Sequence, residues 1–134
     1  MVNNKKYIES MKLDLRIQAD ILKELKSVIQ KENAKSNNAN KSNLLDIGLT
    51  IIFGNPAIKE TLETSINEGR PETTYKRTTF TIHSPIAIKE LGAVQKFDKA
   101  VIVECALIYV IQKLEAGQFK ELMIEYINAG GVLI

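Results

Sequence analysis

The chain has 134 residues, of which 45% are hydrophobic and 25% charged, and its formal net charge is +2, which is typical of one globular domain with a single core. No apolar run approaches the about 18 residues of a membrane-spanning helix, so we expect a soluble, cytoplasmic protein with no membrane partner. The single cysteine, Cys105, excludes an internal disulfide and a cysteine-based zinc site, and the single histidine, His83, argues against histidine-dependent catalysis; we therefore predict no enzyme, no bound metal and no cofactor.

The first predicted element is a strand over residues 12–18. Apolar and polar side chains alternate along it, which is the period of a strand that buries one face. The inward side chains are Leu13, Leu15 and Ile17, and the outward ones are Lys12, Asp14 and Arg16.

Three helices are predicted after this strand. The first carries an apolar stripe over residues 21–29, and Asp20 is its expected N-cap. A polar, asparagine-rich loop over residues 33–43 leads to the second helix, residues 40–53, which is apolar over much of its circumference, as a core helix is. The third helix covers residues 56–68.

A linker over residues 70–76 leads to the second predicted strand, residues 77–83. Its threonines favour a strand because they are β-branched. Phe80 and Ile82 point inward, whereas the outward side chains are Arg77, Thr79 and Thr81.

Three further helices complete the second half. The first has Ser84 as its N-cap and Pro85 at its first position, where the missing N–H is harmless. The second covers residues 98–115, with Asp98 as its expected N-cap, and the third covers residues 118–129.

The two halves repeat each other. Three segments of the first half recur in the same order in the second: residues 22–28 at 88–94, residues 40–49 at 98–107, and residues 58–69 at 119–130. The charge also alternates, because residues 1–42 and 70–99 have a basic excess and residues 43–69 and 100–134 an acidic one. We interpret the chain as a duplication whose two basic parts share one face, although chance variation on a lysine-rich surface explains the charge pattern equally well.

A single strand needs a partner for its backbone groups, so residues 12–18 are expected to pair antiparallel with residues 77–83. The chain then forms one domain, residues 1–134, built from repeats over about residues 12–69 and 77–130. We predict a mainly α protein with a two-stranded antiparallel ribbon, each repeat being extended by a third helix.

This pattern resembles the ribbon-helix-helix family of DNA-binding proteins. The resemblance is carried by the alternating strands and by the core positions of the second helices, which are Leu44, Leu45 and Leu49 in one repeat and Ile102, Val103 and Leu107 in the other. Two chains normally supply the two strands in that family. Both copies lie in one chain here, which is similar to the tandem arrangement of relaxosome accessory proteins of F-type conjugative plasmids.

The resemblance implies that the ribbon enters the major groove of DNA. The residues that would face the bases are Lys12, Asp14, Arg16, Arg77, Thr79 and Thr81. Arg16 would bind a guanine, Asp14 a cytosine amine and the threonine methyl groups thymine. Because the two sets differ, we expect an asymmetric target site; the alternative is an ordinary solvated sheet face.

The resemblance also implies that the second helices point their N-termini at phosphates. Asn40, Lys41 and Lys99 are the expected phosphate contacts. Asn38 tolerates the left-handed backbone conformation that the turn before the first of these helices requires. In the second half, Asp98 would repel a phosphate, which makes that anchor the weaker one.

The predicted function is sequence-specific binding of double-stranded DNA, as a transcriptional repressor or as an accessory factor of plasmid maintenance or transfer, with self-association along DNA. The alternative is a helical protein-interaction module that does not bind DNA. It would use the acidic third helices, residues 56–68 and 118–129, to bind a protein partner.

Overall fold

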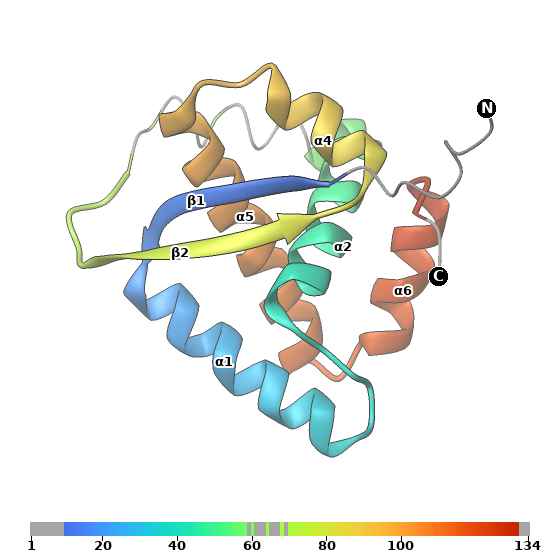
Figure 1. Ribbon diagram of the computed structural model, residues 1–134. Helices are drawn as coiled ribbons and strands as arrows, with labels where there is room; N and C mark the ends of the chain where they lie inside the picture. Colours follow the sequence, from blue (N-terminus) through green and yellow to red (C-terminus); the bar gives the residue numbers. More distant parts are fainter. Residues whose placement is uncertain (1–9, 59, 61–63, 65–67, 69, 132–134) are drawn as a thin grey trace, which may run out of the picture.

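The computed structural model describes residues 10–58, 60, 64, 68 and 70–131 (Figure 1). Its elements, in chain order, are β1 (Met11–Gln18), α1 (Ala19–Ala34), α2 (Lys41–Gly54), β2 (Tyr75–Ile82), α4 (Pro85–Gly92), α5 (Lys96–Glu115) and α6 (Phe119–Asn128). The protein is therefore mainly helical with one two-stranded antiparallel sheet, and a strand–helix–helix order occurs twice, as predicted.

Part of the predicted third helix of the first half falls outside the described residues. Residues 56–58, 60, 64 and 68 are helical, and the remaining positions of 56–68 are not described. The matching helix of the second half, predicted over residues 118–129, is confirmed as α6.

The two strands pair antiparallel, with Leu13 opposite Phe80 and Asp14 opposite Thr79. Residues directly opposite each other point to the same side of a sheet, so the register alone fixes the two faces. On the inner face, the side chains of Leu13, Leu15, Ile17, Phe80 and Ile82 are at most 4% exposed. β2 begins at Tyr75, two residues inside the expected linker, because the ladder extends to the pair Gln18–Tyr75.

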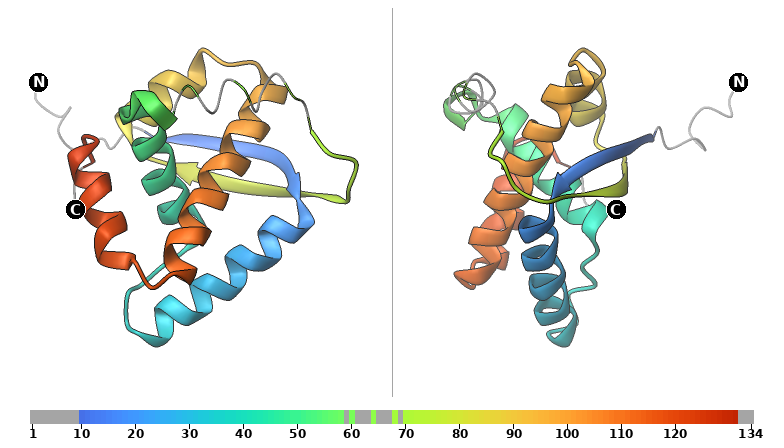
Figure 2. Two further views of the ribbon diagram at one scale, coloured as in Figure 1. Left: turned by 180° about the vertical axis from the view of Figure 1, so that it is seen from behind. Right: turned by 90° about the vertical axis from the view of Figure 1, so that its left-hand side faces the viewer.

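α2 and α5 cover the inner face of this ribbon, while α1, α4 and α6 lie around them (Figure 2). Every residue from Leu44 to Ile52 of α2 is buried. The two helices lie close together at Gly48, where an added Cβ atom would lie 2.8 Å from the carbonyl oxygen of Ala106. Glycine is thus required at this crossing because any side chain would separate the helices.

Two helix starts differ from the prediction. α1 begins at Ala19 with Gln18 at the N-cap position, so Asp20 lies in the first turn and the prediction that it caps the helix is wrong. α5 begins at Lys96 after Gln95, so Asp98 is not the N-cap either. In the first case two contacts with residues far away in the chain hold the start of the helix: the Gln18 N–H donates to Glu104 and the Ala19 N–H to the Thr74 carbonyl.

Two other local predictions, the Ser84–Pro85 start of α4 and the left-handed conformation of Asn38, are confirmed, and Asn40 is a further helix cap that we did not predict. The Ser84 hydroxyl accepts a hydrogen bond from the Ala87 N–H at 3.3 Å, with Pro85 at the start of α4. Asn40 caps α2 by accepting from the Asn43 N–H at 2.9 Å, and Asn38 has a φ of 49°.

Among the described residues, no helix is long and apolar enough to cross a membrane.

Candidate nucleic-acid interface

The outer face of the ribbon brings together the six side chains predicted to face bases. They form three cross-strand pairs: Lys12 with Thr81, Asp14 with Thr79, and Arg16 with Arg77. Thr81 is half-buried and the other five are exposed. In Figures 1 and 2, the described helices lie behind or beside the ribbon and leave this face open.

A diagonal ion pair crosses this face between Arg77 and Asp14. The Arg77 Nε atom is 2.9 Å from Asp14 Oδ1, and the Nη2 atom is 2.5 Å from Oδ2. The hydrogen bonds and the negative charge of Asp14 raise the pKa of Arg77. Two parallel contacts of this kind fix the orientation of a guanidinium group. Asp14 therefore holds Arg77 in place on the ribbon.

The first turn of α2 lies against the edge of β2. The Ser42 hydroxyl accepts a hydrogen bond from the Thr81 N–H at 3.0 Å. Asn40 binds the N–H of Asn43, and the N–H groups of Lys41 and Ser42 stay without a partner inside the helix, as in the first turn of any helix. The helix terminus predicted to meet a phosphate thus lies beside the ribbon.

Lys41 itself turns toward the strand. Its Nζ atom donates to the Thr78 hydroxyl at 3.0 Å and lies 5.3 Å from the centre of the Phe80 ring. The side chain is half-buried, so its charge lies at the ribbon edge rather than in open solvent.

Lys99 occupies a different position in its helix. It is the fourth residue of α5, and its N–H donates to the Gln95 carbonyl at 2.9 Å. Its backbone therefore belongs to the helix interior, and the side chain is half-buried. The two predicted phosphate anchors are not equivalent, because only the Asn40–Lys41 pair lies at a helix terminus.

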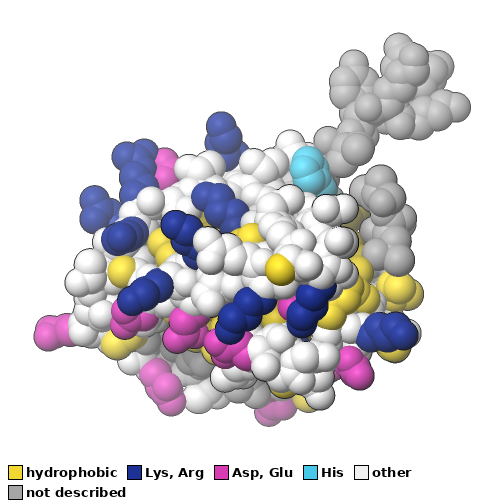
Figure 3. Space-filling view, turned by 90° about the horizontal axis from the view of Figure 1, so that it is seen from below, with side chains coloured by type: hydrophobic (Ala, Val, Ile, Leu, Met, Phe, Trp, Pro, Cys, Tyr) yellow, Lys and Arg dark blue, Asp and Glu magenta, His cyan; other side chains and the backbone are white. Residues whose placement is uncertain are grey.

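Basic and acidic side chains lie on different parts of the face shown in Figure 3. In Figure 3, Lys and Arg occupy the upper and middle parts of the view, whereas most acidic side chains lie in the lower half. The exposed basic residues of the ribbon and of α1 are Lys12, Arg16, Lys76, Arg77, Lys23, Lys26, Lys31 and Lys35. Such a distribution favours a polyanionic partner.

Two buried carboxylates, which we did not predict from the sequence, hold the ends of the ribbon. Glu104 on α5 accepts from the Gln18 N–H at 2.8 Å, where β1 meets α1. Asp46 on α2 accepts from the His83 N–H at 3.0 Å, where β2 meets α4. Each carboxylate therefore binds the strand–helix junction of the other half. The sequence signal was present, because an acid interrupts an apolar segment at the same place in both repeats.

The surroundings of the two carboxylates differ. Glu104 also accepts from the Arg70 guanidinium at 2.6 Å, and Arg70 lies 4.1 Å from the centre of the Tyr75 ring. The second Asp46 partner is the Ser84 N–H at 3.1 Å. Burial raises the pKa of Asp46, and the hydrogen bonds from Ser84 and His83 oppose this increase.

Within the described part of the chain, no three His, Cys, Asp or Glu side chains come together in a group that could hold a metal ion. Comparisons with protein-family models, with curated proteins and with solved structures found no match to this chain.

Proposed function

We propose that the chain is a sequence-specific double-stranded DNA-binding protein of the tandem ribbon-helix-helix type. The observation that carries the proposal is the open outer face of the ribbon, on which six polar side chains of β1 and β2 gather. A two-stranded ribbon fits the major groove of B-DNA, which is about 12 Å wide and in which all four base pairs present different donors and acceptors.

The chemistry of the three cross-strand pairs supports base recognition. Arg16 and Arg77 lie opposite each other at one end of the ribbon, and arginine binds the two acceptors of guanine with two parallel hydrogen bonds. Lys12 and Thr81 lie at the other end, where a threonine methyl group would contact thymine. The target site is therefore expected to be asymmetric.

Asp14 has a different role in this proposal from the one suggested by the sequence. Its carboxylate is bound to Arg77 rather than turned toward a free position. It would orient the Arg77 fork and reduce the attraction of the ribbon to any phosphate backbone. Asp14→Asn is expected to strengthen binding to unrelated duplexes and to weaken discrimination between sequences.

The first turn of α2 would bind a phosphate beside the groove through its free N–H groups and the helix dipole. Lys41 would add its charge there, whereas Lys99 has no equivalent place. The positions of the target sites would decide whether the protein acts as a repressor or in plasmid maintenance or transfer.

Selection of bound duplexes from a random pool tests the proposal. We expect an enriched asymmetric sequence and an affinity that falls steeply with salt, because counterion release accompanies phosphate binding. Arg16→Ala should relax the sequence preference, and Lys41→Ala should weaken binding to all duplexes alike. Lys120→Ala on α6 is the matched control, since it removes one exposed charge far from the ribbon in the fold. No enrichment, or binding that does not respond to salt, would refute the proposal.

One observation favours a second candidate function, a protein contact through α6. Ile124 and Ile127 are 56% and 48% exposed on this helix. Exposed apolar side chains of this kind are common in protein interfaces. If such a contact joins copies along DNA, Ile124→Lys with Ile127→Lys should abolish cooperative binding to a duplex carrying two sites and leave binding to one site unchanged.

A further inference from the structure

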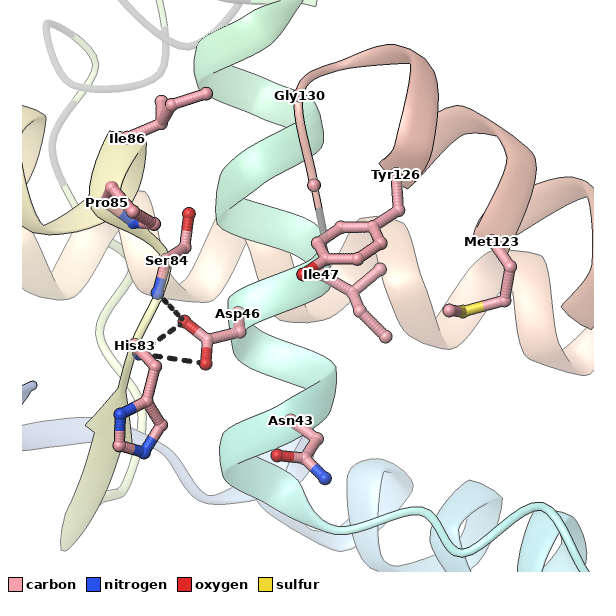
Figure 4. Close-up of a pocket in the computed structure, with 11 residues that line it drawn as sticks. Asn43, Asp46, Ile47, His83, Ser84, Pro85, Ile86, Met123, Tyr126 and Gly130 are labelled. Atoms are coloured by element: carbon pink, nitrogen blue, oxygen red, sulfur yellow. Dashed lines mark hydrogen bonds between the residues drawn. The ribbon is translucent and has the colours of Figure 1, made fainter. Parts of the chain in front are cut away.

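A pocket of about 370 Å³ lies between α2, the junction of β2 with α4, and α6 (Figure 4). The Asp46 carboxylate lies on one side of the pocket, turned toward the backbone of His83 and Ser84, and the Tyr126 ring and Met123 of α6 line the other side. Most of the lining is apolar, with a few polar groups, which is the usual character of a small-molecule site. The volume also falls within the range of such sites.

The Asp46 carboxylate forms part of the pocket wall, and hydrogen bonds compensate its negative charge only partly. Both of its oxygens accept hydrogen bonds from backbone N–H groups, at 3.0 to 3.1 Å, from His83 and Ser84. These donors are neutral. Among the described residues, no lysine or arginine lies within ion-pair distance of this carboxylate.

The other half of the molecule contains a direct counterpart in which a cation is bound. Glu104 occupies the same place on its helix and binds the equivalent junction through the Gln18 N–H. Its Oε2 atom also accepts from the Arg70 guanidinium at 2.6 Å. Arg70 is in turn placed over an aromatic ring, that of Tyr75. A carboxylate, a junction N–H, a cation and a tyrosine thus form one arrangement.

Around Asp46 the carboxylate and the junction N–H groups are present and Tyr126 lines the adjoining pocket, but among the described residues no cation is bound to the carboxylate. We propose that this pocket binds a small organic cation, in which an amidinium, guanidinium or primary ammonium group is attached to a small apolar body. The cationic group pairs with Asp46, and the apolar body packs against Met123 and Ile47. The Tyr126 ring supplies a surface that attracts cations.

The test uses the full chain and two probes of the same shape. Benzamidine is a cation, and benzamide is its neutral counterpart. In NMR titrations we expect benzamidine to shift the resonances of Ile47, Met123 and Tyr126 saturably, with an affinity about tenfold or more above that of benzamide, because a hydrogen bond to a charged group is the stronger one.

Three variants separate the site from a general attraction of cations. Asp46→Asn should lower the benzamidine affinity to that of benzamide. Met123→Trp fills the pocket without touching the junction, so it should abolish binding while the circular dichroism spectrum stays unchanged. Glu121→Gln, which removes an exposed acid on α6, should leave binding unaffected.

Equal binding of the two probes, no binding of either, or full benzamidine affinity in Asp46→Asn or Met123→Trp would overturn the proposal. The titrations contain no DNA, so their outcome is independent of the proposed function.

Discussion

The two halves of the molecule have the same order of elements but different helix lengths. α1 has 16 residues and its counterpart α4 has 8, whereas α2 has 14 and α5 has 20. The features that they share join the halves: the paired strands, the crossing at Gly48 and the carboxylates of Asp46 and Glu104. The features that the two halves share are therefore those at which the halves contact each other, whereas the lengths of the helices differ.

The outer faces of the two strands differ more than their inner faces. β1 presents two cations and an acid on its outer face, whereas β2 presents one cation and two threonines. The side chains that differ lie where the proposed function requires contact with DNA.

The largest expected effect concerns the two buried carboxylates. Glu104→Gln removes the charge that pairs with Arg70, so the free energy of unfolding should fall by about 3 to 5 kcal/mol. The same change in the other half, Asp46→Asn, should cost about 1 to 2 kcal/mol, because Asp46 has only backbone donors. Urea denaturation followed by circular dichroism measures both values, and equal losses would contradict the difference between the halves.

The next effect concerns the two strands. If the ribbon binds bases, Arg16→Ala should weaken binding to the preferred duplex by about 1 to 3 kcal/mol, because a pair of hydrogen bonds to guanine is lost. Thr81 is the third of the β2 side chains predicted to face bases, as Arg16 is of those of β1. Thr81→Ala should weaken binding less than Arg16→Ala does, since a methyl contact involves no hydrogen bond. Fluorescence anisotropy with labelled duplex measures this order, and the reverse order would show that β2 dominates recognition.

A smaller effect concerns two helix ends, one in each half, that have the same backbone geometry. In both α1 and α5, the residue after the C-cap has a positive φ: Ser36 at 66° and Gly117 at 73°. The following N–H binds the carbonyl of Glu32 in the first case and of Lys113 in the second. Ser36→Gly should stabilise the protein by about 1 kcal/mol, because only glycine adopts this conformation without strain. Gly117→Ala should destabilise it by a similar amount, and chemical denaturation that finds the same sign for both variants would refute this explanation.

The smallest effect is the pH dependence that Asp46 contributes. Because burial raises the pKa of this carboxyl in the folded protein, the folded state binds its proton more tightly than the unfolded chain does. The contribution of Asp46 to stability is therefore greatest below its ordinary pKa of 3.8 and decreases as the pH rises through the folded value. The difference in unfolding free energy between the wild type and Asp46→Asn should be larger at pH 4 than at pH 7, and a difference that grows with pH would contradict the assignment.

The strands, their inner faces and the core helices could be predicted because each depends on a short local period. Leu13, Leu15 and Ile17 are buried as the alternation indicates, and Ser84 caps α4 because Ser-Pro is a local signal. The pairing of the two strands could be predicted because the backbone N–H and C=O groups of each strand need hydrogen-bond partners.

The features that could not be predicted depend on residues far apart in the chain. The start of α1 at Gln18 is bound by Glu104 of the other half, 86 positions away. The contact between Asp14 and Arg77 spans 63 positions and depends on the strand register. The direction of the Lys41 ammonium group depends likewise on Thr78 of the second half.

The ribbon is formed by β1 and β2 of one polypeptide, so dilution cannot separate its two strands. In a DNA-binding ribbon assembled from two identical subunits, every mutation appears in both strands and alters the recognition of both halves of the DNA site together. A mutation in this chain alters one strand alone, and each strand is therefore free to acquire its own preference by independent evolution.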